Sequence, residues 1–265
     1  MPAPDDALPT AYFKRLDAAR FEATARVGGG WNPAEQHIAP ALGLLVHAIE
    51  SDRDRRGQGH LRVARVSCEI LGTLPIAAVD IEVAVLRPGR TIELVEATLR
   101  HAGRAAVLMR AWLMQEYPAP ALTGSAFERI AGPDALPPWS LAELWPGAFV
   151  RSVEARRAQR EPGRAASWVR TDVALIEAET VSPVARMMGL VDVANGLTPR
   201  VHADQAAFPN LDLNAHLFGD PDPDWIGLDT TVAFGGNGLG LTHSVVHNRG
   251  GAIGVVSQCL TVRPR

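Results

Sequence analysis

The chain has 265 residues, of which 47% are hydrophobic, and a formal net charge of -3 at pH 7. This length suits one large domain or two modules of about 100–150 residues, and the apolar content is enough to bury a sizeable core. The balance of 26 Lys and Arg against 29 Asp and Glu excludes the basic surface that nucleic-acid binding requires, so no nucleic-acid partner is expected.

The sequence shows no targeting signal, and this absence together with the cysteine usage indicates a cytoplasmic protein. The first residues show no basic region followed by an apolar stretch, as a secretory signal would, and no apolar run reaches the roughly 18–20 residues of a membrane helix. Cys68 and Cys259 lie in apolar, strand-like runs without CxxC spacing, which predicts buried free thiols in a reducing compartment. We therefore expect a soluble, cytoplasmic protein with no membrane partner.

The first half of the sequence predicts one apolar helix followed by strands. After residues 11–27 and a glycine-rich turn at 28–30, the run PALGLLVHAIE predicts a helix over 40–50, because proline is tolerated in a first helical turn. A helix that is apolar all round is expected to be buried on more than one side. Apolar and polar residues then alternate, as half-buried strands require, in the runs 61–71, 79–86, 91–101 and 105–114.

Prolines and glycines interrupt residues 118–163, which predicts a linker between an N-terminal module, 1–117, and a C-terminal module, 164–265. The second module repeats the order of the first. An extended stretch leads to Ser182 and Pro183, which read as an N-cap and a first helical position, and an apolar helix over 184–195 is expected to end at Gly196. Further strands are expected at 210–218, 225–234, 239–247 and 252–262.

The two halves can be laid over one another. VARVSCEIL, from Val63, falls on NLDLNAHLF, from Asn210, and the last hairpin of each half matches if one extra residue is allowed in the second turn. The shared order of extended segments, apolar helix and antiparallel strands is typical of an α+β fold. A sheet that curls around one central helix would bury such a helix on several sides.

Three phrases resemble the bacterial acyl-CoA thioesterase II family, the double hot-dog thioesterases: MMGLVDVANG, FPNLDLNAHLFG and GGAIGVVSQCLTVRPR. The resemblance covers nearly the whole chain and implies a tandem double hot-dog fold, in which each half is a curved antiparallel sheet wrapped around a central apolar helix. It also implies a thioester hydrolase of fatty-acid metabolism that acts on acyl-CoA. Coenzyme A would arrive as part of the substrate, so no separate cofactor is expected. No metal is expected either, because His216, His243 and His247 read as ordinary strand histidines. Apolar outer sheet faces are compatible with a homo-oligomer.

In that family a water held by an Asp, a Thr and a Gln attacks the thioester carbonyl, and no covalent intermediate forms. The Asp matches Asp192 and the Gln matches Gln258, whereas the Thr position falls on Asn210. An amide can also hold a water, although it differs from a hydroxyl in length and donor pattern. The resemblance therefore implies Asp192, Gln258 and Asn210 as the catalytic residues.

The residues by themselves leave structural alternatives open for each of the three. Gln258 shares a strand face with apolar neighbours and can be a structural amide bonded to backbone. Asp192, near the end of the expected helix, can lie on an exposed edge, or can be partly buried with a raised pKa. Asn210 can belong to a polar stripe that faces solvent.

The overlay of the halves supplies a contrast that does not depend on the family. The positions under Gln258, Asn210 and near Asp192 are all apolar in the first half: Ala111, Val63 and Ile49. A site built from these three residues would therefore belong to the second half, with the first half as its structural partner.

Two other functions remain open from the sequence. A hot-dog dehydratase or hydratase would pair a catalytic His with an acid, and His47 on the first helix has no obvious acidic partner in the sequence. A non-catalytic module that binds acyl-CoA or an acyl carrier is the second alternative, whereas the sequence has no GxSxG motif of a serine hydrolase. The basic residues Arg53, Arg55 and Arg56 read as a solvated helix end, or alternatively as a patch for coenzyme A phosphates.

Overall fold

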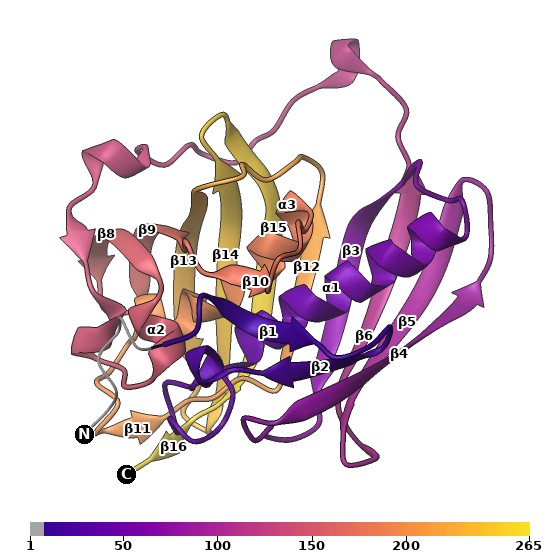
Figure 1. Cartoon of the computed structure of the whole chain (residues 1–265). Helices are drawn as coiled ribbons and strands as arrows, with labels where there is room; N and C mark the ends of the chain where they lie inside the picture. Colours follow the sequence, from indigo (N-terminus) through magenta and orange to yellow (C-terminus); the bar gives the residue numbers. More distant parts are fainter. Residues whose placement is uncertain (1–7) are drawn as a thin grey trace.

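The computed structural model describes residues 8–265. The first half supplies a long helix and six strands (Figure 1). They are β1 (Ala11–Arg15), β2 (Arg20–Ala23), the 3-10 turn η2 (Ala25–Val27), α1 (Ile38–Arg55), β3 (Leu61–Ile70), β4 (Ala78–Arg87), β5 (Ile92–His101) and β6 (Arg104–Gln115). The four strands expected after the helix are confirmed to within one or two residues.

The second half supplies the remaining strands and several short helices. The strands are β7 (Pro138–Trp139), β8 (Glu154–Glu161), β9 (Arg164–Arg170), β10 (Ala174–Ile176), β11 (Ala206–Ala207), β12 (Asp212–Leu217), β13 (Ile226–Phe234), β14 (Leu239–Asn248), β15 (Gly251–Thr261) and β16 (Arg263–Pro264). The helical segments are η3 (Pro120–Leu122), η4 (Pro133–Ala135), η5 (Leu141–Glu143), α2 (Ala148–Arg151), α3 (Pro183–Met188), η6 (Val191–Val193) and α4 (Ala194–Leu197).

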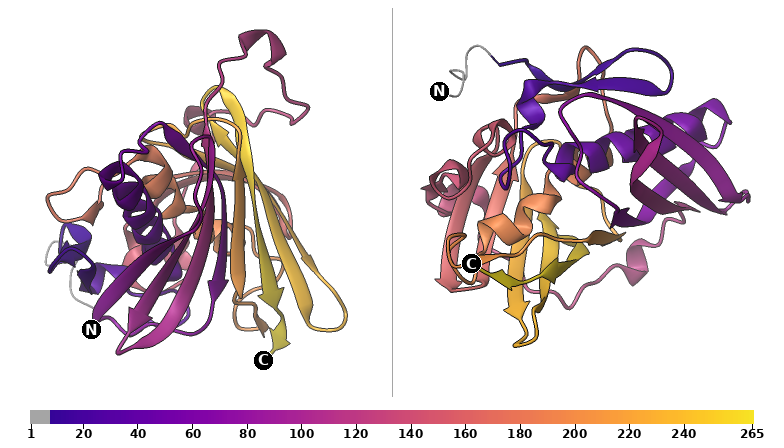
Figure 2. Two further views of the ribbon diagram at one scale, coloured as in Figure 1. Left: turned by 90° about the vertical axis from the view of Figure 1, so that its right-hand side faces the viewer. Right: turned by 90° about the horizontal axis from the view of Figure 1, so that it is seen from below.

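One large sheet connects the two halves. Among the described residues its strand order is β10-β1-β2-β4-β5-β6-β3-β12-β15-β14-β13-β9-β8-β7, and β3 and β12 join the halves as antiparallel neighbours. Helices α1 and α3 lie on the inner side of this sheet, and α1 is enclosed between β4–β6 and the β1–β2 hairpin (Figures 1 and 2). This arrangement confirms the expected α+β double hot-dog, with each half of the sheet curving around helical segments.

The central helix α1 is longer than its apolar run. Its apolar residues are buried on several sides, among them Leu42, Leu45 and Ile49, as an all-round apolar helix predicts. It continues past residue 50 because its charged last turns are stabilised by pairs along the helix, in which Asp52 contacts both Arg55 and Arg56 at 3.1 and 2.7 Å.

The helix expected over 184–195 is broken in the structure. Ser182 caps α3 as predicted, since its hydroxyl accepts a hydrogen bond from Ala185 N at 3.0 Å, but α3 ends at Met188 and is followed by the separate turns η6 and α4. Gly196 lies within α4 and does not end the helix. The break occurs where α3 crosses α1: a Cβ on Gly43 would lie 2.6 Å from Ala185 O and 2.9 Å from Gly189 Cα.

The segment 118–163, which the sequence predicts to be a linker, is partly folded into the sheet. Its first portion connects the halves with short turns, but β7 and β8 lie within it, and β8 pairs with β9 along nearly its whole length. Proline spacing misses these strands because β7 is only two residues long and β8 is mostly polar and exposed. The module boundaries at 117 and 164 stay a prediction.

Strand register confirms the internal repeat. Ala111 pairs with Val95 in the first half, and Gln258 pairs with Thr242 at the same spacing in the second. The closing pairs of the two hairpins, His101 with Arg104 and Asn248 with Gly251, enclose turns of equal length, so the extra residue allowed in the sequence overlay is not needed.

Candidate active site

Asp192 lies in η6, in the break between α3 and α4. Its side chain is buried, with 4% of the residue exposed, and its neighbours Val191 and Val193 are buried as well. The alternative of an exposed Asp on a helix edge is therefore wrong, and so is its placement near the end of one continuous helix. The carboxylate points into the protein because the chain turns at this position.

Gln258 and Asn210 approach Asp192 from two neighbouring strands. Along β15 the side chains alternate, so that Val256, Gln258 and Leu260 face inward and are buried, with Gln258 only 1% exposed. The same alternation turns Cys259 outward, and its exposure contradicts the expectation that both cysteines are buried. Asn210 forms a bridge with Leu260 just before β12 begins, which brings it beside Gln258.

The three side chains meet at one carboxylate oxygen. Asn210 Nδ2 donates a hydrogen bond to Asp192 Oδ1 at 2.7 Å, and Gln258 Nε2 donates to the same oxygen at 2.8 Å. Asn210 Nδ2 also donates to the carbonyl oxygen of Asp212 at 3.0 Å, and Gln258 Nε2 to that of Asp192 at 3.4 Å. The solvent-facing polar stripe proposed for Asn210 is therefore wrong, and Gln258 bonds mainly to a side chain.

These contacts fix how both amides are turned. An ionised carboxylate can only accept hydrogen bonds, so each amide presents its NH₂ group to Asp192 and its oxygen elsewhere. Gln258 Oε1 is buried and has no hydrogen-bond partner among residues 8–265, and the buried hydroxyl of Thr242, opposite Gln258 in β14, has none there either. The arrangement leaves a buried acceptor beside the carboxylate, where a water or substrate group can donate to it.

Burial decides the protonation behaviour of Asp192. Removal from water raises its pKa from 3.8 to about 7, although the hydrogen bonds from Asn210 and Gln258 act in the opposite direction. A carboxylate with a pKa close to neutrality can take up a proton and release it again at physiological pH, which is what a general base requires.

His37 is a neighbour of Asp192 that the sequence interpretation missed. It is the N-cap of α1, where its Nδ1 accepts a hydrogen bond from Ala39 N at 3.2 Å, and this nitrogen lies 3.7 Å from Asp192 Oδ2. Burial lowers the pKa of His37 to about 3, so the contact joins a neutral imidazole to the carboxyl group and is no ion pair. Pro40 could have pointed to His37, because a proline in the first helical turn places the N-cap a few residues earlier.

A cavity of about 610 Å³ opens beside this group. Both halves line it, so the first half does more than support the site. The lining residues are Gly29, Gly30, Trp31, Asn32, Glu35, Gln36, His37, Ile38, Ile70, Leu71, Gly72, Thr73, Leu74, Asp192, Asn195, Ala207, Pro209, Asn210, Leu211, Thr261, Arg263 and Arg265. A substrate in this cavity would meet the buried carboxylate of the second half and the start of α1 from the first.

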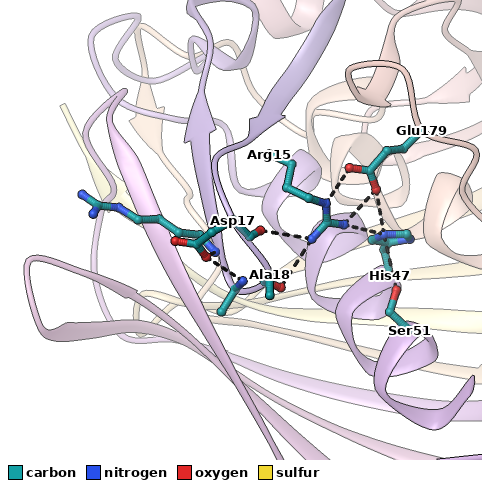
Figure 3. Close-up of polar contacts among 8 residues, drawn as sticks. Arg15, Asp17, Ala18, His47, Ser51 and Glu179 are labelled. Carbon is teal, nitrogen blue, oxygen red and sulfur yellow. Dashed lines mark hydrogen bonds and ion pairs between the residues drawn. The ribbon is translucent and has the colours of Figure 1, made fainter. Parts of the chain in front are cut away.

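His47 does have an acidic partner in the structure, although none is apparent from the sequence. Figure 3 shows His47 on α1 facing Glu179, which follows β10, and the two side chains are 3.5 Å apart. Arg15 binds both carboxylate oxygens of Glu179, at 2.6 and 2.8 Å, and holds the pKa of Glu179 below its usual value. A dehydratase needs a carboxylic acid that can donate a proton, and a carboxylate held ionised by Arg15 does not fit that role.

The basic residues at the end of α1 are all paired with acids. Arg53 contacts Glu50 and Asp54, Arg55 contacts Asp52, and Arg56 contacts Asp52 and Glu93. They lie at the opposite end of α1 from His37 and Ile38, which line the cavity. This geometry supports a helix end stabilised by ion pairs and leaves no free basic patch there for phosphates.

Fold and site together define a double hot-dog protein with a buried carboxyl group, held by two amides, at the wall of a cavity. Two family models match the chain: an acyl-CoA thioesterase N-terminal domain over residues 27–114 and an acyl-CoA thioesterase C-terminal domain over residues 133–262. The chain therefore belongs to the acyl-CoA thioesterase family and is a thioester hydrolase. No curated protein sequence matches it.

Solved structures share the fold along nearly the whole chain. A putative thioesterase II from Thermobifida fusca superimposes with a TM-score of 0.73 at 17% identity, covering 100% of this chain and 99% of that one. A putative thioesterase from Novosphingobium aromaticivorans gives 0.71 at 17%, covering 94% and 98%. An acyl-CoA thioesterase II from Mycobacterium marinum gives 0.65 at 14%, covering 97% and 96%.

Two further observations concern metals and membranes. Within residues 8–265, no group of three or more His, Cys, Asp or Glu side chains is placed to hold a metal ion. No helix in that part of the chain has both the length and the apolar character that a membrane crossing demands.

Proposed function

We propose that the protein hydrolyses acyl-CoA thioesters by direct attack of a water that Asp192, Gln258 and Asn210 orient. The observation that carries this proposal is the buried Asp192 carboxyl group, which has a pKa near neutrality and two amide donors on one of its oxygens. Its second oxygen and the unpaired Gln258 Oε1 are acceptors for the two hydrogens of a water. A water held in this way keeps a lone pair free to attack.

The reaction then proceeds in two steps. As the water oxygen bonds to the thioester carbonyl carbon, Asp192 takes one of the water's protons, and a tetrahedral intermediate with a negatively charged oxygen forms. When the carbon–sulfur bond breaks, Asp192 returns its proton to the leaving thiolate, and the products are a carboxylic acid and coenzyme A. Asn210 and Gln258 stabilise the ionised form of Asp192 and set its orientation.

The surroundings of Asp192 argue against a cysteine nucleophile. Cys68 is a thiol whose pKa is influenced by Asp192, and both burial and this nearby charge raise that pKa. Since the thiolate is the reactive form, a thiol kept protonated is a poor nucleophile. The remaining covalent route would be attack by Asp192 itself, which forms a mixed anhydride.

The first experiment measures free thiol release from a panel of acyl-CoA esters that range from short to long and aromatic chains. Wild type is compared with Asp192→Asn, Gln258→Ala and Arg90→Gln, an exposed arginine on the β4–β5 loop that serves as control. Turnover by wild type and the control, with strongly reduced turnover in the first two variants, supports the proposal. Turnover by Asp192→Asn at the wild-type rate rejects this carboxylate as the base.

A single turnover in ¹⁸O-labelled water separates direct attack from an anhydride. Direct attack places the label in the product acid during the first turnover. An anhydride opened by water at the Asp192 carbonyl would instead leave the label in Asp192, which mass spectrometry of the peptide would detect, and the mechanism proposed here would then be wrong. Absence of turnover on every ester, with acyl-CoA still bound, would favour the binding-module alternative.

A further inference from the structure

Two arginines reach the cavity from the last strand. β16 is held against β11 by the pairs Ala206 with Pro264 and Ala207 with Arg263, and Arg265 N donates to Gln205 O at 3.0 Å. Residues two apart in an extended chain point to the same side, so Arg263 and Arg265 share one face of this ribbon. Both line the same cavity as Asp192.

Neither guanidinium group has an ion-pair or hydrogen-bond partner within residues 8–265. The nearest recorded neighbour is the ring of Trp31, whose centroid lies 6.0 Å from the guanidinium carbon of Arg265. The other charged side chains that line the cavity are Glu35 and Asp192. Two unpaired cations beside a cavity contrast with the arginines at the end of α1, each of which contacts a carboxylate.

The cavity has a charged, exposed end and a buried end. Arg263 and Arg265 are exposed, whereas Asp192 is almost fully buried. Trp31 also lines the cavity, and its ring packs edge-on against Trp145 and Phe208 at centroid distances of 4.7 and 5.2 Å. A ligand with an anionic head and a long, uncharged arm matches this gradient, because its head stays in contact with water and cations while its arm reaches the carboxyl group.

We propose that Arg263 and Arg265 bind the phosphate groups at the end of a pantetheine arm, and so hold the carrier half of the thioester at the cavity mouth. This rests on the proposed function, since it assumes that the thioester reaches Asp192. Guanidinium groups suit the role because their planar fork of donors matches phosphate oxygens and their charge is permanent. The shared chemistry is a phosphorylated pantetheine, which occurs both in coenzyme A and on acyl carrier proteins.

The direct test is the binding of coenzyme A itself, measured by titration calorimetry, which needs no turnover. The double variant Arg263→Gln/Arg265→Gln should bind coenzyme A about tenfold or more weakly than wild type, since hydrogen bonds between charged groups are the strongest class. Arg90→Gln removes one exposed positive charge away from the cavity and should leave the affinity unchanged. Equal affinity of the double variant and wild type would overturn the proposal.

A second readout protects the test from a general loss of structure. With acyl-pantetheine, which carries no phosphate, kcat/KM of the double variant should equal that of wild type, while with acyl-CoA its KM should rise and its kcat should stay close to wild type. An equal loss on both substrates would mean that the arginines maintain the site or the fold, and would reject phosphate binding. Since coenzyme A binding is measured separately, failure of hydrolysis and failure of this site are distinguishable.

Acyl-phosphopantetheine distinguishes the two sources of phosphate. If the double variant loses as much on this substrate as on acyl-CoA, the arginines hold the phosphate next to pantetheine, which a carrier protein also presents. If the loss appears with acyl-CoA alone, they hold the nucleotide phosphates, and coenzyme A is the carrier. Either pattern supports the proposal, whereas loss on neither substrate contradicts it.

Discussion

The central helices of the two halves differ in a way that decides where a polar residue can be buried. α1 is an unbroken helix from Ile38 to Arg55, and its middle is packed with apolar side chains. Its counterpart is divided into α3, η6 and α4, and Asp192 lies in the break. In the first half the positions aligned with Gln258 and Asn210 hold Ala111 and Val63, both buried.

The two halves have the same strand arrangement but contribute different parts of the candidate site. The strands pair in the same register on both sides, so the site needs no new architecture. It needs a helix break that points a carboxylate inward and two amides on adjacent strands that receive it. The apolar half contributes the long helix, and the N-terminal end of that helix forms a wall of the cavity.

The largest expected effect comes from Asp192→Asn. This change keeps the size of the side chain and removes the proton acceptor, so kcat should fall by roughly 10²–10⁴-fold, the usual contribution of a general base. The matched control is Asp172→Asn, at an exposed acid in the loop after β9, which should retain full activity. Thiol release from acyl-CoA measures both.

The pH profile of kcat/KM should rise about tenfold per unit and level off above pH 7, because burial raises the pKa of Asp192 to about 7 and the ionised form is the base. Residual activity of Asp192→Asn should lack this rise. A wild-type profile that levels off near pH 4 would show that Asp192 titrates like an exposed carboxyl group.

The same titration predicts a change in stability. The folded protein keeps a proton on Asp192 that the unfolded chain releases, since the pKa is about 7 in the first and 3.8 in the second. The proton on Asp192 therefore adds to the free energy of unfolding, fully below about pH 4 and no longer once the pH has risen to about 7. At about 1.4 kcal/mol per pKa unit, the free energy of unfolding falls by a few kcal/mol at most over this range. Urea unfolding should show Asp192→Asn gaining on wild type over this range, and parallel curves would contradict the raised pKa.

Replacing Gln258 with alanine, the residue of the first half, should lower kcat by roughly 10–100-fold, because it removes one donor to Asp192 and one acceptor for water. The reciprocal change, Ala111→Gln, should give no increase in activity over wild type. It should destabilise the fold by about 1–3 kcal/mol, as a buried amide without partners does. Activity assays and urea unfolding measure the pair. An unchanged free energy of unfolding in Ala111→Gln would show that the first half also tolerates a buried amide at this position.

Asn210 offers a milder comparison. Asn210→Thr restores the residue that the family resemblance implies and still supplies a donor, so kcat should stay within about tenfold of wild type. Asn210→Val, the residue of the first half, supplies none, and its kcat should fall below that of the Thr variant. Equal rates for the Thr and Val variants would mean that the donor to Asp192 Oδ1 is dispensable.

The smallest effect is expected at Glu35, a half-buried acid that lines the cavity together with Arg263 and Arg265. Glu35→Gln removes a negative charge near the phosphates and should tighten coenzyme A binding by about two- to threefold at low salt, with less gain at high salt. Weaker binding in this variant would indicate that Glu35 acts as a partner of the ligand.

Local and periodic signals were enough to predict the repeated α+β frame and most strand boundaries, because alternation and capping residues can be recognised in the sequence alone. Asp192, Gln258 and Asn210 were implied by the family resemblance, and the overlay of the halves added only that the matching positions of the first half are apolar. Three features became visible only in the folded chain: the second helix breaks at its crossing with α1, β8 belongs to the sheet, and His37, Arg263 and Arg265 share a cavity with Asp192. Helix crossings, edge-strand pairing and cavity walls join residues that are far apart in the chain, so no local sequence pattern shows which of them meet.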